Sequence, residues 1–129
     1  MTPELTALAL AVLLQAAQLA LYSVLGQKAA GTRAALEPRD TPIALPGRAG
    51  RAKRAMGNHF EGLILFTAAV VIVTASGQST AFTAAMAWIY LAARVLYVPA
   101  YLFGWVPGRS LVWAAGFLAT LAMVLAALL

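Results

Sequence analysis

The stretch RAKRAMGNHFE at residues Arg51–Glu61 decides the fold, because it leads without a proline or a turn into the apolar run GLILFTAAVVIV. An unbroken passage from polar to apolar residues predicts one helix that enters a membrane from water or headgroups. Arg51, Arg54, Asn58 and Glu61 follow an i, i+3, i+7, i+10 spacing, which keeps them on one helical face. Asn58 and Glu61 stand at or inside the membrane boundary, where polar side chains are costly unless they are paired or functional.

The composition assigns the class of protein. Hydrophobic residues make up 63% of the 129 residues and charged residues only 10%, so a soluble domain of this size could not bury its apolar surface. The chain is therefore predicted to be an integral membrane protein. It has no cysteine, which excludes catalysis by a thiolate of the chain itself. It has a single histidine, His59, so no metal site is predicted. A structural or interfacial role is expected for His59.

The apolar segments predict an all-α fold of one domain with four membrane spans, at residues about 4–25, 48–76, 81–103 and 109–129. Gly26 is expected to end the first helix. The loop 26–47 has no convincing periodicity, and Pro38, Pro42 and Pro46 each break a helix there. An even number of spans with short connections predicts an up-down-up-down four-helix bundle.

Basic residues gather in and just after the loop, while the 77–80 turn and both termini carry no basic residue. By the positive-inside rule, the loop and the 104–110 turn with Arg109 face the cytoplasm, and both termini lie on the other side. No aromatic residue is interleaved with the basic cluster before Phe60, and membrane spans flank it. These features argue against nucleic acid as a partner and favour a topology signal combined with an anion site.

In the third span, Arg94, Tyr97 and Tyr101 are spaced i, i+3, i+7 and share one helical face. An arginine inside an apolar segment must face protein, water or an anion, because contact with lipid costs several kcal/mol. Glu61 is the intramembrane carboxylate available to pair with it. An ion pair between Glu61 and Arg94 and direct contact of Arg94 with a ligand are both open, and they are compatible.

Arg109 and Ser110 follow Pro107-Gly108 at the start of the fourth span. The free N–H groups of a helix N-terminus, together with an arginine, suit an anion or a thiolate. The alternative is an arginine that reaches the membrane interface, with Ser110 as the N-cap. Taken together, the polar residues describe a pocket near the membrane boundary for a flexible anionic ligand, which an apolar second substrate could reach from the lipid.

These motifs resemble the MAPEG family (membrane-associated proteins in eicosanoid and glutathione metabolism). The pattern R-x-x-R-A-x-x-N-x-x-E matches Arg51, Arg54, Ala55, Asn58 and Glu61, and R-x-x-Y-x-x-x-Y matches Arg94, Tyr97 and Tyr101. Pro107 followed by Arg109-Ser110 resembles the family's turn before span four. The chain departs from prostaglandin-forming members at Trp113, Ala114 and Phe117, where those members carry polar side chains.

The resemblance implies a homotrimer with glutathione between the helices of neighbouring subunits. It implies that the arginines, Asn58 and Glu61 hold the carboxylates and amine of glutathione, that the tyrosines line the same site, and that Arg109 stabilises the thiolate. A lipophilic electrophile would be conjugated, or a lipid hydroperoxide reduced. The compact Ala- and Leu-rich sequence favours a bacterial member, in the inner membrane with both termini in the periplasm.

Three hypotheses for the function make different structural predictions. An enzyme should turn Arg54, Asn58, Glu61, Arg94 and Tyr101 toward a common cavity. A non-catalytic protein of the same fold that binds a lipid or another ligand should turn Arg109 away from that cavity. A purely structural role for the polar residues should give no ligand, a tight Glu61–Arg94 pair and tight pairs between Arg51 and its neighbours.

Overall fold

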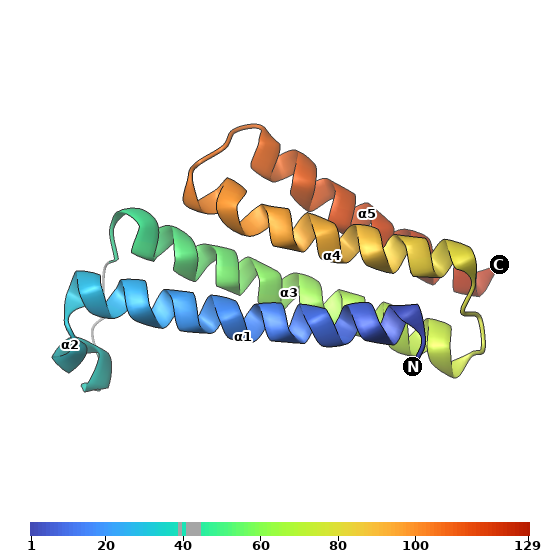
Figure 1. Cartoon of the computed structure of the whole chain (residues 1–129), viewed down its shortest axis with the longest axis horizontal. Coiled ribbons are helices and arrows are strands. Elements are labelled where there is room, and N and C mark those ends of the chain that lie inside the picture. Colours follow the sequence, from blue (N-terminus) through green and yellow to red (C-terminus); the bar gives the residue numbers. More distant parts are fainter. Residues whose placement is uncertain (39, 41–44) are drawn as a thin grey trace.

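The computed structural model describes residues 1–38, 40 and 45–129. Its helices are α1 (Pro3–Ala30), α2 (Thr32–Leu36), α3 (Gly47–Ala75), α4 (Ala81–Leu102) and α5 (Gly108–Leu128) (Figure 1). Within the described residues, α1, α3, α4 and α5 are each long and apolar enough to cross a membrane. The predicted all-α membrane fold is confirmed.

The four long helices run alternately up and down along one axis (Figure 1). Helices α3 and α4 pack against each other and against both of the others, whereas no contact joins α1 to α5 among the described residues. The central pair is therefore α3 and α4, which carry the motifs that the sequence singled out. This arrangement places the polar faces of α3 and α4 beside the start of α5.

The first helix is longer than expected, because it continues through Gly26 to Ala30 and ends at Gly31. A single glycine inside a helix costs only about 1 kcal/mol, which the packing of a long apolar helix outweighs. Gly31 has a φ of 89°, a backbone conformation that favours glycine. The expected loop also contains the short helix α2, where Arg33 and Glu37 form an ion pair of 2.8 Å. The predicted break at Pro42 lies outside the described residues.

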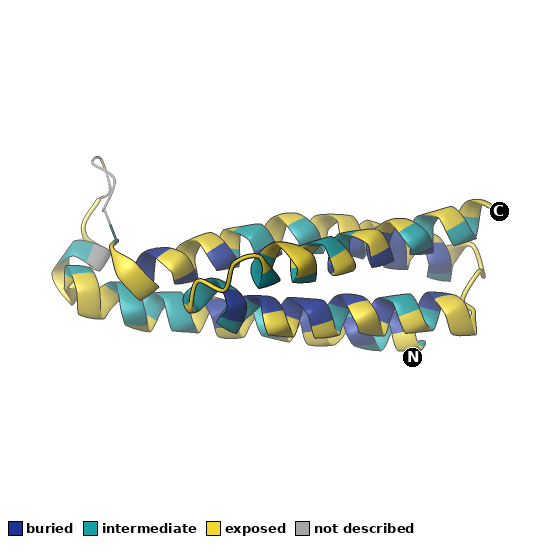
Figure 2. Ribbon diagram, turned by 90° about the horizontal axis from the view of Figure 1, so that it is seen from above, coloured by how far each residue is buried: buried dark blue, intermediate teal, exposed yellow. Residues whose placement is uncertain are grey.

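The packed core lies away from the basic loop and is built largely from small side chains (Figure 2). Ala7, Ala11, Ala69, Ala87 and Ala119 are all buried in it. Small residues let membrane helices approach closely, so dispersion contacts replace the hydrophobic driving force that lipid removes. The ring of Phe66 on α3 stacks on Tyr90 of α4 with centroids 3.8 Å apart, which closes the core toward the polar half of the bundle.

The two ends of the bundle differ in chemistry. The arginine end, defined by Arg48, Arg51, Arg54 and Arg109, comprises the start of α3, the end of α4 and the start of α5. At the opposite end, here called the Glu4 end, the Glu4 carboxylate accepts hydrogen bonds from Thr83 Oγ1 at 2.5 Å and Ser79 Oγ at 2.9 Å. Thr80 and Thr83 also form a capping box that starts α4. These bonds tie the start of α1 to the turn between α3 and α4.

Candidate functional site

Arginine and tyrosine side chains alternate along the polar face of α4. The Arg94 guanidinium lies 4.6 Å from the centroid of the Tyr97 ring, and the Tyr97 and Tyr101 rings are 5.5 Å apart. The Arg109 guanidinium then lies 4.8 Å from the Tyr101 centroid. Each cation is within the range at which the negative face of a ring attracts it. The two tyrosines therefore hold Arg94 and Arg109 at fixed positions on one side of the bundle.

The two arginines of the α3 motif bind the end of α4 instead of sharing one ligand-facing row with Asn58 and Glu61. Arg51 Nη1 donates to the carbonyl oxygen of Leu102 at 3.1 Å. Arg54 Nε donates to the Tyr101 hydroxyl at 3.2 Å. A guanidinium near the last carbonyls of a helix also complements the helix dipole. Arg51 is thus engaged in joining α3 to α4, while Arg54 orients Tyr101.

A polar cavity, here called the upper cavity, opens between α3, α4 and α5 at the arginine end. Its volume is about 300 Å³, and it is lined by Asn58, Tyr97, Tyr101, Arg109, Ser110 and Trp113. Five of the nine residues predicted from the sequence to form the site therefore meet in one space. Arg109 faces it with a positive charge, and Arg54 contacts its wall through Tyr101. The charge balance of the upper cavity favours an anion.

The start of α5 differs from the expectation in one respect. The backbone N–H of Arg109 donates to the carbonyl of Trp105 at 3.0 Å, and that of Ser110 donates to the carbonyl of Pro107 at 3.0 Å. These two donors are already used, and Ser110 lies inside α5 instead of capping it, since Pro107 occupies the N-cap position. The groups that Arg109 and Ser110 offer to the upper cavity are therefore their side chains.

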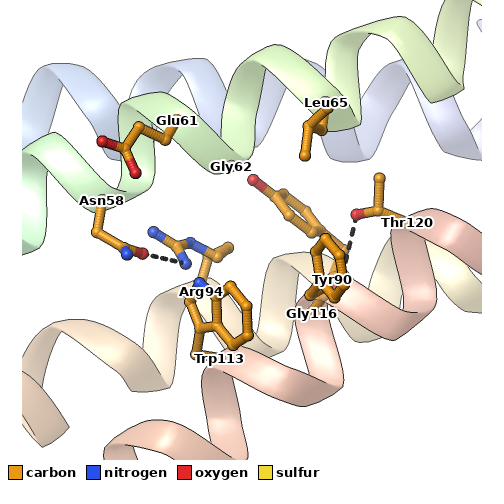
Figure 3. Close-up of a pocket in the computed structure, with 10 residues that line it drawn as sticks. Asn58, Glu61, Gly62, Leu65, Tyr90, Arg94, Trp113, Gly116 and Thr120 are labelled. Atoms are coloured by element: carbon orange, nitrogen blue, oxygen red, sulfur yellow. Dashed lines mark hydrogen bonds between the residues drawn. The ribbon is translucent and has the colours of Figure 1, made fainter.

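A second space, the lower cavity, lies deeper in the bundle between the same three helices and has a volume of about 150 Å³. Arg94 lies at its edge and donates from Nη1 to Asn58 Oδ1 at 3.0 Å (Figure 3). No ion pair within 4 Å joins Arg94 to Glu61, although both line this cavity. The amide of Asn58 takes the place of the expected carboxylate, because the Arg94 guanidinium lies nearer to it. Asn58 and Trp113 line both cavities.

Of the ten residues that line the lower cavity, sequence reasoning named only Asn58, Glu61 and Arg94 as site residues. Those that it missed include Gly62, Tyr90 and Gly116. Tyr90 precedes Arg94 by four residues, so the i, i+4, i+7, i+11 spacing of Tyr90, Arg94, Tyr97 and Tyr101 could have indicated it. The two glycines gave no such signal, because their contribution is space. On the other side of α3, buried His59 forms a hydrogen bond of 2.6 Å between its Nδ1 and Gln15 Oε1 of α1. His59 therefore joins two helices, as its expected structural role requires.

Comparison with known proteins identifies the family. A family model described as the MAPEG family matches residues 5–129. The chain belongs to the MAPEG family. Comparisons with curated proteins and with solved structures gave no match.

MAPEG membership and the four apolar helices make the chain an integral membrane protein of the glutathione and eicosanoid metabolism family. The match spans all four long helices, and so includes both cavities. Both cavities are lined by residues of the three helices that the bundle brings together, α3, α4 and α5. The polar space between those helices is the natural candidate for a ligand site.

Proposed function

We propose that this MAPEG protein is a membrane-bound glutathione-dependent transferase or peroxidase that binds glutathione in the upper cavity. The observation that carries the proposal is the position of Arg109, whose guanidinium lines that cavity while Tyr101 holds it from one side. A fixed cation beside a bound thiol lowers the pKa of the thiol, and the thiolate is the reactive nucleophile. The Ser110 hydroxyl beside it can donate a further hydrogen bond to the sulfur.

The remaining polar groups suit the rest of glutathione. One of its carboxylates can pair with Arg54, since guanidinium groups favour bidentate binding of carboxylates. Its amine can reach the carboxylate of Glu61, which is exposed and has no ion-pair partner among the described residues. Arg94 keeps Asn58 turned toward the upper cavity. MAPEG membership further implies a homotrimer in which a neighbouring subunit covers the exposed side of the site.

The lipophilic second substrate would enter from the bilayer and be conjugated, or be reduced if it is a hydroperoxide. We place the arginine end in the cytoplasm, as the positive-inside rule predicts, which gives glutathione access from the aqueous side. A bacterial inner membrane fits this orientation, with both termini in the periplasm. The position of Arg109 in the wall of the upper cavity favours the enzyme over the non-catalytic alternative.

The test is glutathione binding to the detergent-purified protein, combined with the ultraviolet absorbance of the thiolate. Saturable binding with a thiolate signal that Arg109→Ala removes is the expected result. Arg33→Ala is the matched control, because it deletes the same charge from α2, outside both cavities. Binding without a thiolate would support a ligand-binding MAPEG protein instead. Absence of binding at millimolar glutathione would overturn the assignment of glutathione.

A further inference from the structure

The lower cavity contains hydrogen-bond donors that no group among the described residues accepts. Arg94 Nε and Nη2 and the Tyr90 hydroxyl are buried without a partner, and the two residues are only 3% and 2% exposed. Only Nη1 of Arg94 is used, in its bond to Asn58. A buried polar group without a partner costs about 1–3 kcal/mol, and more when it is charged. Three such donors on two neighbouring residues indicate an acceptor that is bound from outside the chain.

These donors are held in place by the packing around them. The Tyr90 ring stacks on Phe66 with an angle of 13° between the planes, which points its hydroxyl toward Gly62 (Figure 3). The Arg94 guanidinium is fixed between Asn58 and the face of the Tyr97 ring. An acceptor oxygen would therefore meet donors whose orientation is set before it binds, which reduces the entropy cost of binding.

Two glycines keep the approach to the donors open. A Cβ atom added at Gly62 would lie 3.4 Å from the Tyr90 hydroxyl and 3.8 Å from Arg94 Cζ. One added at Gly116 would lie 3.7 Å from Tyr90 Cδ2 and 3.8 Å from Arg94 Cδ. Both are ordinary contact distances, so alanine fits at either position without moving its neighbours. The absence of these two methyl groups leaves room for a ligand beside the donors.

Asn58, Glu61 and Thr120 add polar groups to the lining of the lower cavity, and the rest of its wall is apolar and limits the size of the ligand. Leu65 of α3 and Trp113 and Phe117 of α5 line it, with the Trp113 and Phe117 rings stacked 5.1 Å apart. An apolar cavity of about 150 Å³ is large enough for benzene. The buried part of a ligand is therefore a compact ring or a short branched group, and an extended acyl chain would not fit inside.

We propose that the lower cavity binds the oxygen-bearing end of a compact apolar co-substrate, whose carbonyl or hydroperoxide oxygen accepts hydrogen bonds from Tyr90 and Arg94. Its identity as a co-substrate site rests on the proposed function. The upper and lower cavities share Asn58 and Trp113, so a ligand in the lower one adjoins the thiol that Arg109 would activate. Tyr90 and Arg94 would then select co-substrates by size and by the presence of an acceptor oxygen.

The probe for this proposal is cyclohexanone, which combines a benzene-sized ring with one acceptor oxygen and does not react with thiols by conjugate addition. Its dissociation constant is measured by ligand-observed NMR on the full chain in lipid nanodiscs, with empty nanodiscs as the background. Tyr90→Phe keeps the ring stack and removes one donor, so we expect binding to weaken about three- to tenfold. Gly62→Ala places a methyl group 3.4 Å from the Tyr90 hydroxyl and 3.8 Å from Arg94 Cζ, in the space where the acceptor oxygen would bind, and we expect at least about tenfold weaker binding.

Gly57→Ala is the matched control for Gly62→Ala, because it adds the same methyl group to α3 where nothing lies within 4 Å. Glutathione binding is measured on the same samples. Weaker cyclohexanone binding in both cavity variants, with glutathione binding retained, supports the proposal. It is overturned if the wild type binds glutathione but not cyclohexanone, if the variants bind cyclohexanone as the wild type does, or if glutathione displaces cyclohexanone. Cyclohexanone binding without any glutathione binding would overturn the proposed function. The lower cavity would then be the ligand site of a non-catalytic binding protein.

Discussion

The Glu4 end and the arginine end both bury charged side chains, but the two ends differ in how far those side chains are hydrogen-bonded. Glu4 has no exposed surface, and the hydroxyls of Ser79 and Thr83 donate to its carboxylate. Arg94, on the side of the bundle nearer the arginine end, is almost as deeply buried and keeps two nitrogens without an acceptor. A charge with partners stabilises a fold, whereas an unsatisfied one lowers stability. The difference separates the structural end of the bundle from the end at which we propose that a ligand binds.

The largest effect on stability is expected at Glu4. Glu4→Ala removes the charged acceptor of the buried Thr83 hydroxyl and of the exposed Ser79 hydroxyl, and it should lower the free energy of unfolding by about 2 kcal/mol. Glutathione affinity should not change, because the Glu4 end is remote from both cavities. Unfolding of the detergent-purified protein by heat or denaturant measures the first quantity, and glutathione titration the second.

Thr6→Ala is the control for this change, since the Thr6 hydroxyl bonds only to the Thr2 carbonyl within the same helix start. It should alter the free energy of unfolding by less than about 0.5 kcal/mol. Equal stability of Glu4→Ala and the wild type would mean that the Glu4 end does not hold the bundle together.

Arg94→Met should have the opposite pattern. Methionine has a similar length and no charge, so the substitution removes an unsatisfied buried cation and should leave stability equal or higher. Glutathione affinity should fall about tenfold, because Asn58 loses the guanidinium that orients it and the site loses positive charge. The same two measurements apply. A clear drop in the melting temperature would show that Arg94 belongs to the structural part of the bundle.

The sequence predicted the fold correctly because hydropathy alone requires four long apolar helices. It predicted the arrangement of the polar residues only in part. Helical spacing assigned Arg51, Arg54, Asn58 and Glu61 to one face, and this spacing says nothing about which parts of a neighbouring helix lie opposite. The lengthwise position of α4 against α3 brings Leu102 and Tyr101 next to the arginines and leaves Asn58 beside Arg94. That relation arises only in the packed bundle.

The lower cavity could not be predicted for a related reason. It exists where Gly62 of α3 and Gly116 of α5 face Tyr90 of α4, so it depends on the coincidence of small residues on separate helices. Composition and periodicity report the polarity and position of the side chains that are present. They do not predict the space that two glycines leave between three helices.

A smaller effect is expected between the two ends, where the half-buried Gln15 of α1 meets α3 and the buried Gln18 follows one turn later. Gln15 bonds to His59, whereas neither polar atom of Gln18 has a partner. Gln15→Leu should therefore cost about 1 kcal/mol of stability, because it leaves His59 Nδ1 unsatisfied. Gln18→Leu, the matched change one turn away, should leave stability equal or higher. A larger loss from Gln18→Leu than from Gln15→Leu in thermal unfolding would contradict this assignment.

The smallest effect is expected from Arg51→Lys at the arginine end. Lysine keeps a positive charge near the end of α4 and loses the directed bond to the Leu102 carbonyl, so stability should fall by about 0.5 kcal/mol or less. Glutathione affinity should change less than about twofold, since Arg51 does not line either cavity. Isothermal titration of glutathione into both proteins measures this. A tenfold loss of affinity would place Arg51 in the ligand site after all, through contact with a neighbouring subunit.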